Sequence, residues 1–167
     1  LATVCIFNYN NAAFIAEALE SVVSQKTDFE VEILVGDDAS TDNSRDVVQG
    51  LQAKYPGRIQ LLESGMNLGG TKNWLRTIEA ATADFIFTLD ADDYFTTEDK
   101  IQSQVDALRS DPSLSMAFHA VIEERSLLGV ESETVDFDRR RHTLRDFFES
   151  GWYMRTSSVC FRSKCLS

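Results

Sequence analysis

Residues 85–93 have the sequence FIFTLDADD, a hydrophobic run that ends in three carboxylates within four positions. A short apolar run bounded by polar residues predicts a buried strand, which delivers Asp90, Asp92 and Asp93 together at its C-terminal end. That edge is where ligands bind in open α/β sheets. Clustered anions repel one another unless a cation lies among them, and Mg²⁺ and Mn²⁺ prefer oxygen ligands shared with a substrate phosphate. The stretch therefore predicts a site for a divalent cation and a diphosphate.

Strand and helix patterns alternate along the first two thirds of the chain. Short apolar runs predict strands at residues 3–7, 31–36, 59–62 and 85–89. Apolar residues at helical spacing predict a helix after each strand, with inward-facing side chains at Ile15, Leu19, Val22, Val23, Val47, Val48, Leu51, Tyr55, Trp74, Leu75, Ile78, Ile101, Val105 and Leu108. Asn10 or Asn11 is expected to cap the first helix. The alternation predicts an α/β fold with a Rossmann-like, mostly parallel central sheet and helices on both faces.

This alternation stops after residue 113. Two more strands are expected at residues 116–122 and 157–161, a short helix at 144–148, and a hairpin or irregular loop at 123–138. The 167 residues suffice for one domain, residues 1–167, which we divide into an alternating half, 1–110, and a second half, 111–167. The sequence has no initiator Met and enters a strand at once, so we expect it to be part of a longer protein.

The composition excludes several classes of partner. The net charge is −11, which argues against nucleic-acid binding and against attraction to anionic lipid. Three cysteines without regular spacing, Cys5, Cys160 and Cys165, give neither a disulfide framework nor a zinc signature. Cys5 and Cys160 lie in apolar runs and are expected to behave as small core residues. The pattern is typical of a reducing, cytoplasmic setting.

Three loops follow the carboxyl ends of predicted parallel strands, at residues 7–10, 37–40 and 90–93. Because such ends meet at one edge of a sheet, we expect the three loops to converge there. In the second loop the carboxylates can accept hydrogen bonds from a nucleobase, and Ser40 with the following helix N-terminus offers donors. The second loop therefore suits a base or ribose, and the third suits a metal.

A fourth loop and several structural alternatives complete the candidate site. Residues 67–73 have the sequence NLGGTKN, a loop of small residues before a helix, and Lys72 is available for phosphate charge. In the structural alternatives, residues 38–42 form only a helix cap, the glycine pair forms only a tight turn, and Tyr9 packs under the first helix. The three aspartates of the third loop would then be a solvated turn.

Four motifs, taken in order, resemble the family 2 glycosyltransferases of the GT-A fold. The family's opening strand, Tyr-Asn pair and Ser-x-x-x-Gln helix end are matched by VCIFNYN at residues 4–10 and ESVVSQ at residues 20–25. Its later motifs are matched by DDASTD at residues 37–42, by NLG at 67–69 with Asn73, and by DADD at 90–93. Order and spacing agree over roughly residues 1–110. The resemblance implies that residues 1–110 are the nucleotide-sugar-binding half, and that residues 111–167 are the start of an acceptor-side half that is incomplete here.

The resemblance implies roles for these residues. Asp38 would bind the uracil of a UDP-sugar, with Asp37 and Ser40 beside it. Asp92 would contact the ribose or a Mg²⁺ or Mn²⁺ ion, and Asp93 would bind the metal and the diphosphate. The donor-binding set that the resemblance implies is Phe7, Tyr9, Asp37, Asp38, Ser40, Asn67, Lys72, Asn73, Asp90 and Asp92, with Asp92 and Asp93 as metal ligands.

The implied chemistry is transfer of a sugar from a nucleotide-diphosphate donor to an acceptor hydroxyl, with inversion and with help from the metal. The acceptor would be a saccharide or a lipid-linked glycan, with the protein at the inner face of a membrane. The family's general base lies in a Glu-Asp or similar pair after the last matched strand, so we expect it beyond Ser167. Glu123, Glu124 and Glu149 are poor substitutes by position. The usual Pro of the first loop is absent from Phe7-Asn8.

The sequence fits three other functions less well. A non-catalytic module that binds nucleotide-sugars would keep the fold without the base. A haloacid-dehalogenase-type phosphatase also places Asp-x-Asp after a hydrophobic strand, but Tyr94 stands where its motif has Thr or Val. A dinucleotide oxidoreductase is disfavoured because no Gly-x-Gly-x-x-Gly follows the first strand.

Overall fold

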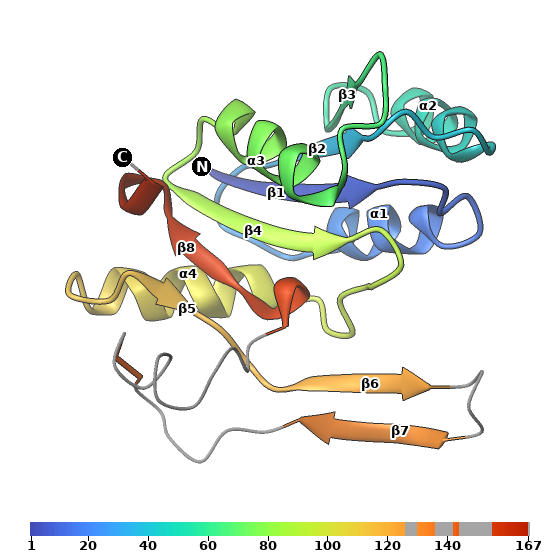
Figure 1. Cartoon of the computed structure of the whole chain (residues 1–167). Coiled ribbons are helices and arrows are strands. Elements are labelled where there is room, and N and C mark those ends of the chain that lie inside the picture. The colour runs from blue at the N-terminus through green and yellow to red at the C-terminus, as the bar shows by residue number, and fades with distance from the viewer. Residues whose placement is uncertain (126–129, 136–141, 144–154, 167) are drawn as a thin grey trace.

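The computed structural model of the chain describes residues 1–125, 130–135, 142–143 and 155–166 (Figure 1). Six strands form the central sheet in the order β3-β2-β1-β4-β8-β5. Its parallel part consists of β1 (Ala2–Asn8), β2 (Val31–Asp37), β3 (Ile59–Glu63) and β4 (Phe85–Asp90). The strand β8 (Cys160–Arg162) pairs antiparallel with β4 and with β5 (Met116–Ala117). The mostly parallel α/β sheet expected from the sequence is therefore confirmed.

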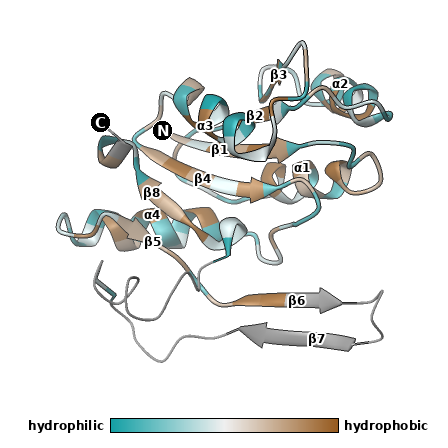
Figure 2. Ribbon diagram, in the orientation of Figure 1, coloured by the Kyte–Doolittle hydropathy of each residue, from teal (hydrophilic) through white to brown (hydrophobic). Residues whose placement is uncertain are grey.

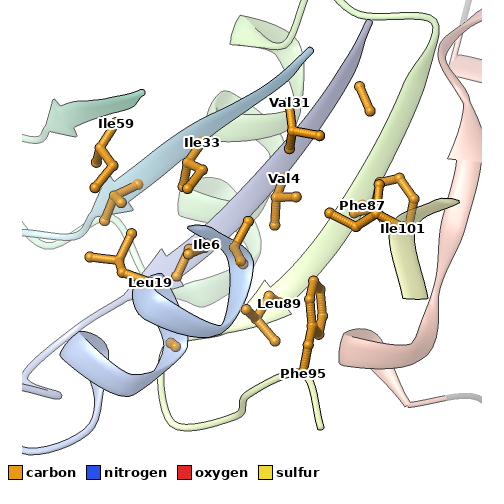
Figure 3. Packing of buried hydrophobic residues seen from close by; sticks show 14 of the residues in the cluster. Val4, Ile6, Leu19, Val31, Ile33, Ile59, Phe87, Leu89, Phe95 and Ile101 are labelled. Carbon is orange, nitrogen blue, oxygen red and sulfur yellow. The ribbon is translucent and has the colours of Figure 1, made fainter. Parts of the chain in front are cut away.

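Helices cover both faces of this sheet. They are α1 (Ile15–Val23), α2 (Ser44–Lys54), α3 (Gly70–Ala80) and α4 (Lys100–Ser110). Side chains alternate along a strand, so Val4 and Ile6 face one core, which α1, α2 and α4 complete (Figure 3). Cys5 between them faces the other core, which α3 covers with Ile78. The two faces of β1 are thus both buried, as a strand without polar alternation requires.

One predicted inward face is wrong in part. On α3, Asn73, Thr77 and Ile78 are buried, whereas the Leu75 side chain is 49% exposed. Residues 73 and 77 are four apart and share a helix face, while residue 75 lies about 200° away from both. The buried face is narrow because α3 lies close to Gly36 of β2, where an added Cβ would be 1.9 Å from Thr77 Oγ1. The face of α3 that carries Asn73 and Thr77 is therefore the one turned to β2, and Leu75 lies on the opposite side.

The expected asparagine cap is also wrong. The helix α1 begins at Ile15 with Phe14 in the cap position, and no side chain caps it. The Asn10 side chain instead accepts hydrogen bonds from the backbone N–H groups of Thr41 and Asp42 in the next loop. A residue expected to act locally therefore joins two loops, which matters for the site.

The expected strand at residues 116–122 is divided in two. Only β5 joins the main sheet, while β6 (Val121–Arg125) pairs antiparallel with β7 (Val130–Val135) in a separate two-stranded sheet. The hairpin expected within residues 123–138 is thus confirmed for these strands. The last strand begins three residues later than predicted, because a 3₁₀ turn, η2 (Thr156–Ser158), precedes β8, and a second, η3 (Ser163–Leu166), follows it. The expected helix at 144–148 lies outside the described residues.

Polarity changes at the carboxyl end of the sheet. Figure 2 shows this change along β4, which is largely hydrophobic and leads into a hydrophilic connection. Among the described residues, no helix has the length and apolar character needed to cross a bilayer.

Candidate functional site

Three loops meet where β2, β1 and β4 end side by side. The strand register pairs Asn8 with Asp37 and Phe7 with Asp90, so the last residues of the three strands lie in one row. Backbone hydrogen bonds continue past the strands, from Asp38 N–H to Asn8 O (2.9 Å) and from Ala91 N–H to Phe7 O (3.1 Å). The structure therefore brings together the loops after residues 7, 37 and 90 at one edge of the sheet.

The first two loops are tied together by side chains. Asn8 Nδ2 donates to Asp37 Oδ1 at 2.8 Å and to Ser40 Oγ at 3.1 Å. Asn10 Oδ1 accepts from Thr41 N–H at 2.8 Å. Asn10 and Ala39 both have a left-handed backbone, with φ of 56° and 59°. Asparagine tolerates this conformation, but for alanine it is costly and persists only where surrounding contacts hold it, so this pair of loops is preorganised.

Asp37 is a buried anion at the centre of this network. Its side chain is 1% exposed and accepts from Arg45 Nε at 2.6 Å and from Ser40 N–H at 3.1 Å. Burial raises the pKa of Asp37, but hydrogen bonds from Ser40, Arg45 and Asn8 outweigh it and hold the pKa below its ordinary value. The ionised carboxylate therefore holds the loop in place.

Asp38 and Asn73 are buried as well and bind the protein's own backbone. Asp38 accepts from Leu68 N–H at 2.7 Å and from Gly69 N–H at 2.9 Å, which fixes the loop before α3. Asn73 Nδ2 donates to Gly36 O at 2.8 Å. Both residues order the backbone around the candidate site, and whether Asp38 also binds a base stays a prediction.

The other predicted donor-binding residues are more accessible. Tyr9 is 47% exposed, Phe7 and Ser40 are half-buried, and Asn67 and Lys72 are exposed. Lys72 lies in the first turn of α3, where the helix N-terminus favours an anion. The structure thus divides the predicted set into buried residues that support the loops and exposed ones that can reach a ligand.

The acidic loop after β4 has a different character. Asp90 is half-buried at the end of the strand, while Asp92 and Asp93 are exposed. Burial, together with the negative charges of Asp93 and Asp92, raises the pKa of Asp90 to about 6, against a hydrogen bond from Thr156 that lowers it. The charges of Asp93 and Asp92 therefore lie close enough to Asp90 to affect its ionisation.

This donor set fits a divalent cation only in part. All the groups are carboxylate oxygens, which Mg²⁺ and Mn²⁺ prefer. Among the described residues, however, no three His, Cys, Asp or Glu side chains are arranged to hold a metal by themselves. Mg²⁺ is commonly bound by one or two carboxylates together with substrate phosphates and water. Asp92 and Asp93 therefore suit a cation that a diphosphate helps to hold.

Sequence reasoning missed several residues that build this edge. Arg76 Nη2 donates to the carbonyl oxygens of Asp37 (2.7 Å) and Leu62 (3.0 Å), and so covers the ends of β2 and β3. Arg45 and Asn8 hold Asp37, and Ser157 donates to the Asp93 carboxylate. The one available signal was Asn8, a polar residue at the end of an apolar strand. The others depend on tertiary contacts that no periodicity records.

Comparison with known proteins gives the family. The model of glycosyl transferase family 2 matches residues 3–166. The chain belongs to this family. An uncharacterised protein of Mycobacterium tuberculosis is 30% identical over 155 residues, which cover 93% of this chain and 45% of that protein. A dTDP-rhamnosyl transferase of Shigella flexneri is 36% identical over 104 residues, which cover 60% of this chain and 35% of that protein.

Solved structures show the same fold. The mannosyltransferase PcManGT of Pyrobaculum calidifontis, in complex with GDP-Man and Mn²⁺, has a TM-score of 0.73 at 21% identity, covering 99% of this chain and 45% of that one. TarS residues 1–349 of S. aureus, in complex with UDP-GlcNAc, has a TM-score of 0.76 at 20% identity, covering 99% and 46%. The GT-A fold expected from the motifs is confirmed. The chain spans about 45% of the length of the curated relatives that match it over 155 residues.

Proposed function

We propose that this chain supplies the donor-binding part of a glycosyltransferase that moves a sugar from a nucleotide-diphosphate donor, preferably a UDP-sugar, to an acceptor hydroxyl. The observation that supports it best is the convergence of two unlike loops at one sheet edge. A preorganised loop lies after β2 and an acidic loop after β4, and Phe7 and Asn8 of β1 lie between them. Membership of the family and the GDP-Man and UDP-GlcNAc complexes of its structural neighbours support the same function.

In this proposal Asp92 and Asp93 bind Mg²⁺ or Mn²⁺ jointly with the diphosphate. The cation would supply charge neutralisation for the leaving diphosphate. Lys72 at the start of α3 adds positive charge near the phosphates, and Tyr9 offers an exposed ring beside the loop of Asp38 for the base. The Mn²⁺ in the mannosyltransferase complex is consistent with this use of a metal.

Inverting transfer also needs a general base for the acceptor's proton. We assign no base among the described residues, and we propose that it lies elsewhere in the protein. The acceptor is proposed to be a saccharide or a lipid-linked glycan, and the site of action the cytoplasmic face of a membrane. The family match over residues 3–166 argues against the phosphatase alternative, whereas a binding module without turnover is distinguished by a sugar-transfer assay on the full-length protein.

Calorimetric titration tests the donor site. UDP, GDP and dTDP would be titrated into the wild type and Asp93→Asn, each with and without Mn²⁺. We expect UDP to bind more tightly with Mn²⁺ than without it. In Asp93→Asn, UDP affinity in the presence of Mn²⁺ should fall about tenfold or more, because one ligand of the cation becomes neutral.

Asp84→Asn is the matched control, because Asp84 is an exposed aspartate that directly precedes β4 at the other end of the strand. It should bind like the wild type. Metal-independent binding, or equal losses in the two variants, would contradict the proposed metal site. Failure of all three nucleotides to bind would contradict the donor site itself.

A further inference from the structure

The 3₁₀ turn η2 lies directly against the acidic loop. Ser157 is 9% exposed. Its Oγ donates a hydrogen bond to Asp93 Oδ2 and accepts one from Asp90 N–H at 3.4 Å. The turn is itself anchored to the strand, because Thr88 Oγ1 donates to Thr156 O at 2.6 Å. A residue from the second half of the chain therefore contacts a carboxylate 64 positions earlier in the sequence.

The direction of these hydrogen bonds follows from chemistry. A serine hydroxyl has one proton, and an ionised carboxylate can only accept. The proton of Ser157 therefore points to Asp93, and a lone pair of Oγ is left for the backbone N–H of Asp90. The two hydrogen bonds connect the backbone at the end of β4 through a buried hydroxyl to an exposed carboxylate. Asp93 is thereby tied to the rigid sheet.

We propose that Ser157 is a positioning residue for the divalent cation, and that it acts by orienting the Asp93 carboxylate. The inference rests on the proposed function, since it takes Asp93 as a ligand of the cation. A carboxylate offers about four lone-pair positions, so a hydrogen bond from Ser157 is compatible with metal binding. Hydrogen-bond partners of metal ligands fix ligand orientation, and losing one typically weakens metal binding 10–100-fold.

The same contact revises the division of the chain. Residues 1–110 were expected to contain the nucleotide-sugar site, yet Ser157 lies in the second half. In this inference the strand β8 and the turn before it complete the metal site, and the first half alone lacks one of its supports.

The test is a double-mutant cycle in Mn²⁺ affinity, measured in the presence of UDP by calorimetry and by the electron paramagnetic resonance signal of free Mn²⁺. The variants are Ser157→Ala, Asp93→Asn and the double variant. Ser158→Ala is the matched control, because Ser158 is a fully buried hydroxyl of the same turn that donates to Arg155 O at 2.7 Å. Melting temperature and binding of UDP without metal are recorded for each variant.

We expect Ser157→Ala to weaken Mn²⁺ binding 10–100-fold with metal-free UDP binding unchanged, and Ser158→Ala to bind Mn²⁺ like the wild type. In the Asp93→Asn background, Ser157→Ala should have no further effect, because it acts through Asp93. Wild-type Mn²⁺ affinity in Ser157→Ala, or an equal loss in both backgrounds, would overturn the inference and leave the proposed function standing. A wild type without Mn²⁺-dependent nucleotide binding would overturn both this inference and the proposed metal site, and a wild type that binds no nucleotide would overturn the proposed donor site.

Discussion

The loop after β2 is held by buried hydrogen bonds from β1, α2 and its own backbone, whereas the loop after β4 leaves two of its three carboxylates exposed. Asp37 forms a salt bridge with Arg45, and its carboxylate oxygens accept hydrogen bonds from Ser40 and Asn8. In the acidic loop, burial and then the negative charges of Asp93 and Asp92 raise the pKa of Asp90. The loop after β2 therefore has its charges paired within the protein, whereas the carboxylates of the acidic loop are arranged to favour a cation.

A lysine is buried next to β4 and the segment that follows the acidic loop. Lys100 of α4 is 8% exposed, and its ammonium group lies 3.9 Å from the Phe95 ring centre and 5.0 Å from that of Phe87. Gln104 Oε1 accepts its hydrogen bond at 3.0 Å. Burial lowers the pKa of Lys100 to about 7, against a smaller opposing effect of Cys160. An ammonium group that folding disfavours therefore lies against Phe87 of β4 and against Phe95, which follows the acidic loop.

The largest expected effect is therefore on the pH dependence of stability. In the unfolded chain Lys100 binds its proton up to a pKa of about 10.4, but in the native state it releases the proton near pH 7. Between these values the unfolded state holds more protons, so the free energy of unfolding rises with pH. Lys100→Met should remove this slope and stabilise the protein at pH 6, by roughly 2–4 kcal/mol.

Urea unfolding at pH 6, 7.5 and 9 measures this slope. The control is Lys54→Met, which replaces an exposed lysine on α2 and should keep the wild-type dependence on pH. A wild-type slope that persists in Lys100→Met would show that Lys100 is not the group responsible.

The second prediction concerns the close contact between β2 and α3, next to the loop that follows β2. At Gly36 an added Cβ would lie 1.9 Å from Thr77 Oγ1 and 3.2 Å from Asn73 Oδ1. Gly36→Ala should destabilise the protein by roughly 2 kcal/mol, since α3 must move or Thr77 must give up its 2.7 Å hydrogen bond to Asn73 O. Thermal unfolding measures the change, and UDP binding should weaken because Asn73 holds the carbonyl of Gly36.

Two further variants sharpen this result. Thr77→Ala in the Gly36→Ala background should recover part of the lost stability by making room. Gly50→Ala, within α2 where nothing lies within 4 Å of the added Cβ, should instead stabilise by about 0.5–1 kcal/mol. A neutral Gly36→Ala would mean that α3 is not held close to β2.

Part of this site could be predicted from the sequence. Strands β1 to β4 and the helices between them follow from local periodicity, and the convergence of the loops follows from parallel topology. Asp37 and Asp93 could be found because motif and strand end coincide. Ser157 could not, because its contact joins residues 64 positions apart across an antiparallel strand. The outward position of Leu75 likewise depends on the close approach of α3 to Gly36, which periodicity does not record.

The smallest expected effect concerns backbone strain in the loop after β2. Ala39 has a φ of 59°, which glycine adopts without the penalty that a Cβ brings. Ala39→Gly should therefore stabilise the protein by about 0.5 kcal/mol, the relief of strain being offset in part by the greater freedom of glycine in the unfolded chain. Chemical unfolding measures the sign.

Gly57→Ala is the reciprocal control, because Gly57 has a φ of 77° with open space around it. It should destabilise by about 1 kcal/mol, since only the backbone conformation opposes the new Cβ. If Ala39→Gly lowers stability instead, the native Ala39 side chain causes no net strain at its left-handed backbone conformation. Hydrogen bonds alone would then preorganise the loop after β2. That loop would differ from the acidic loop after β4 only in that its charged side chains are paired within the protein.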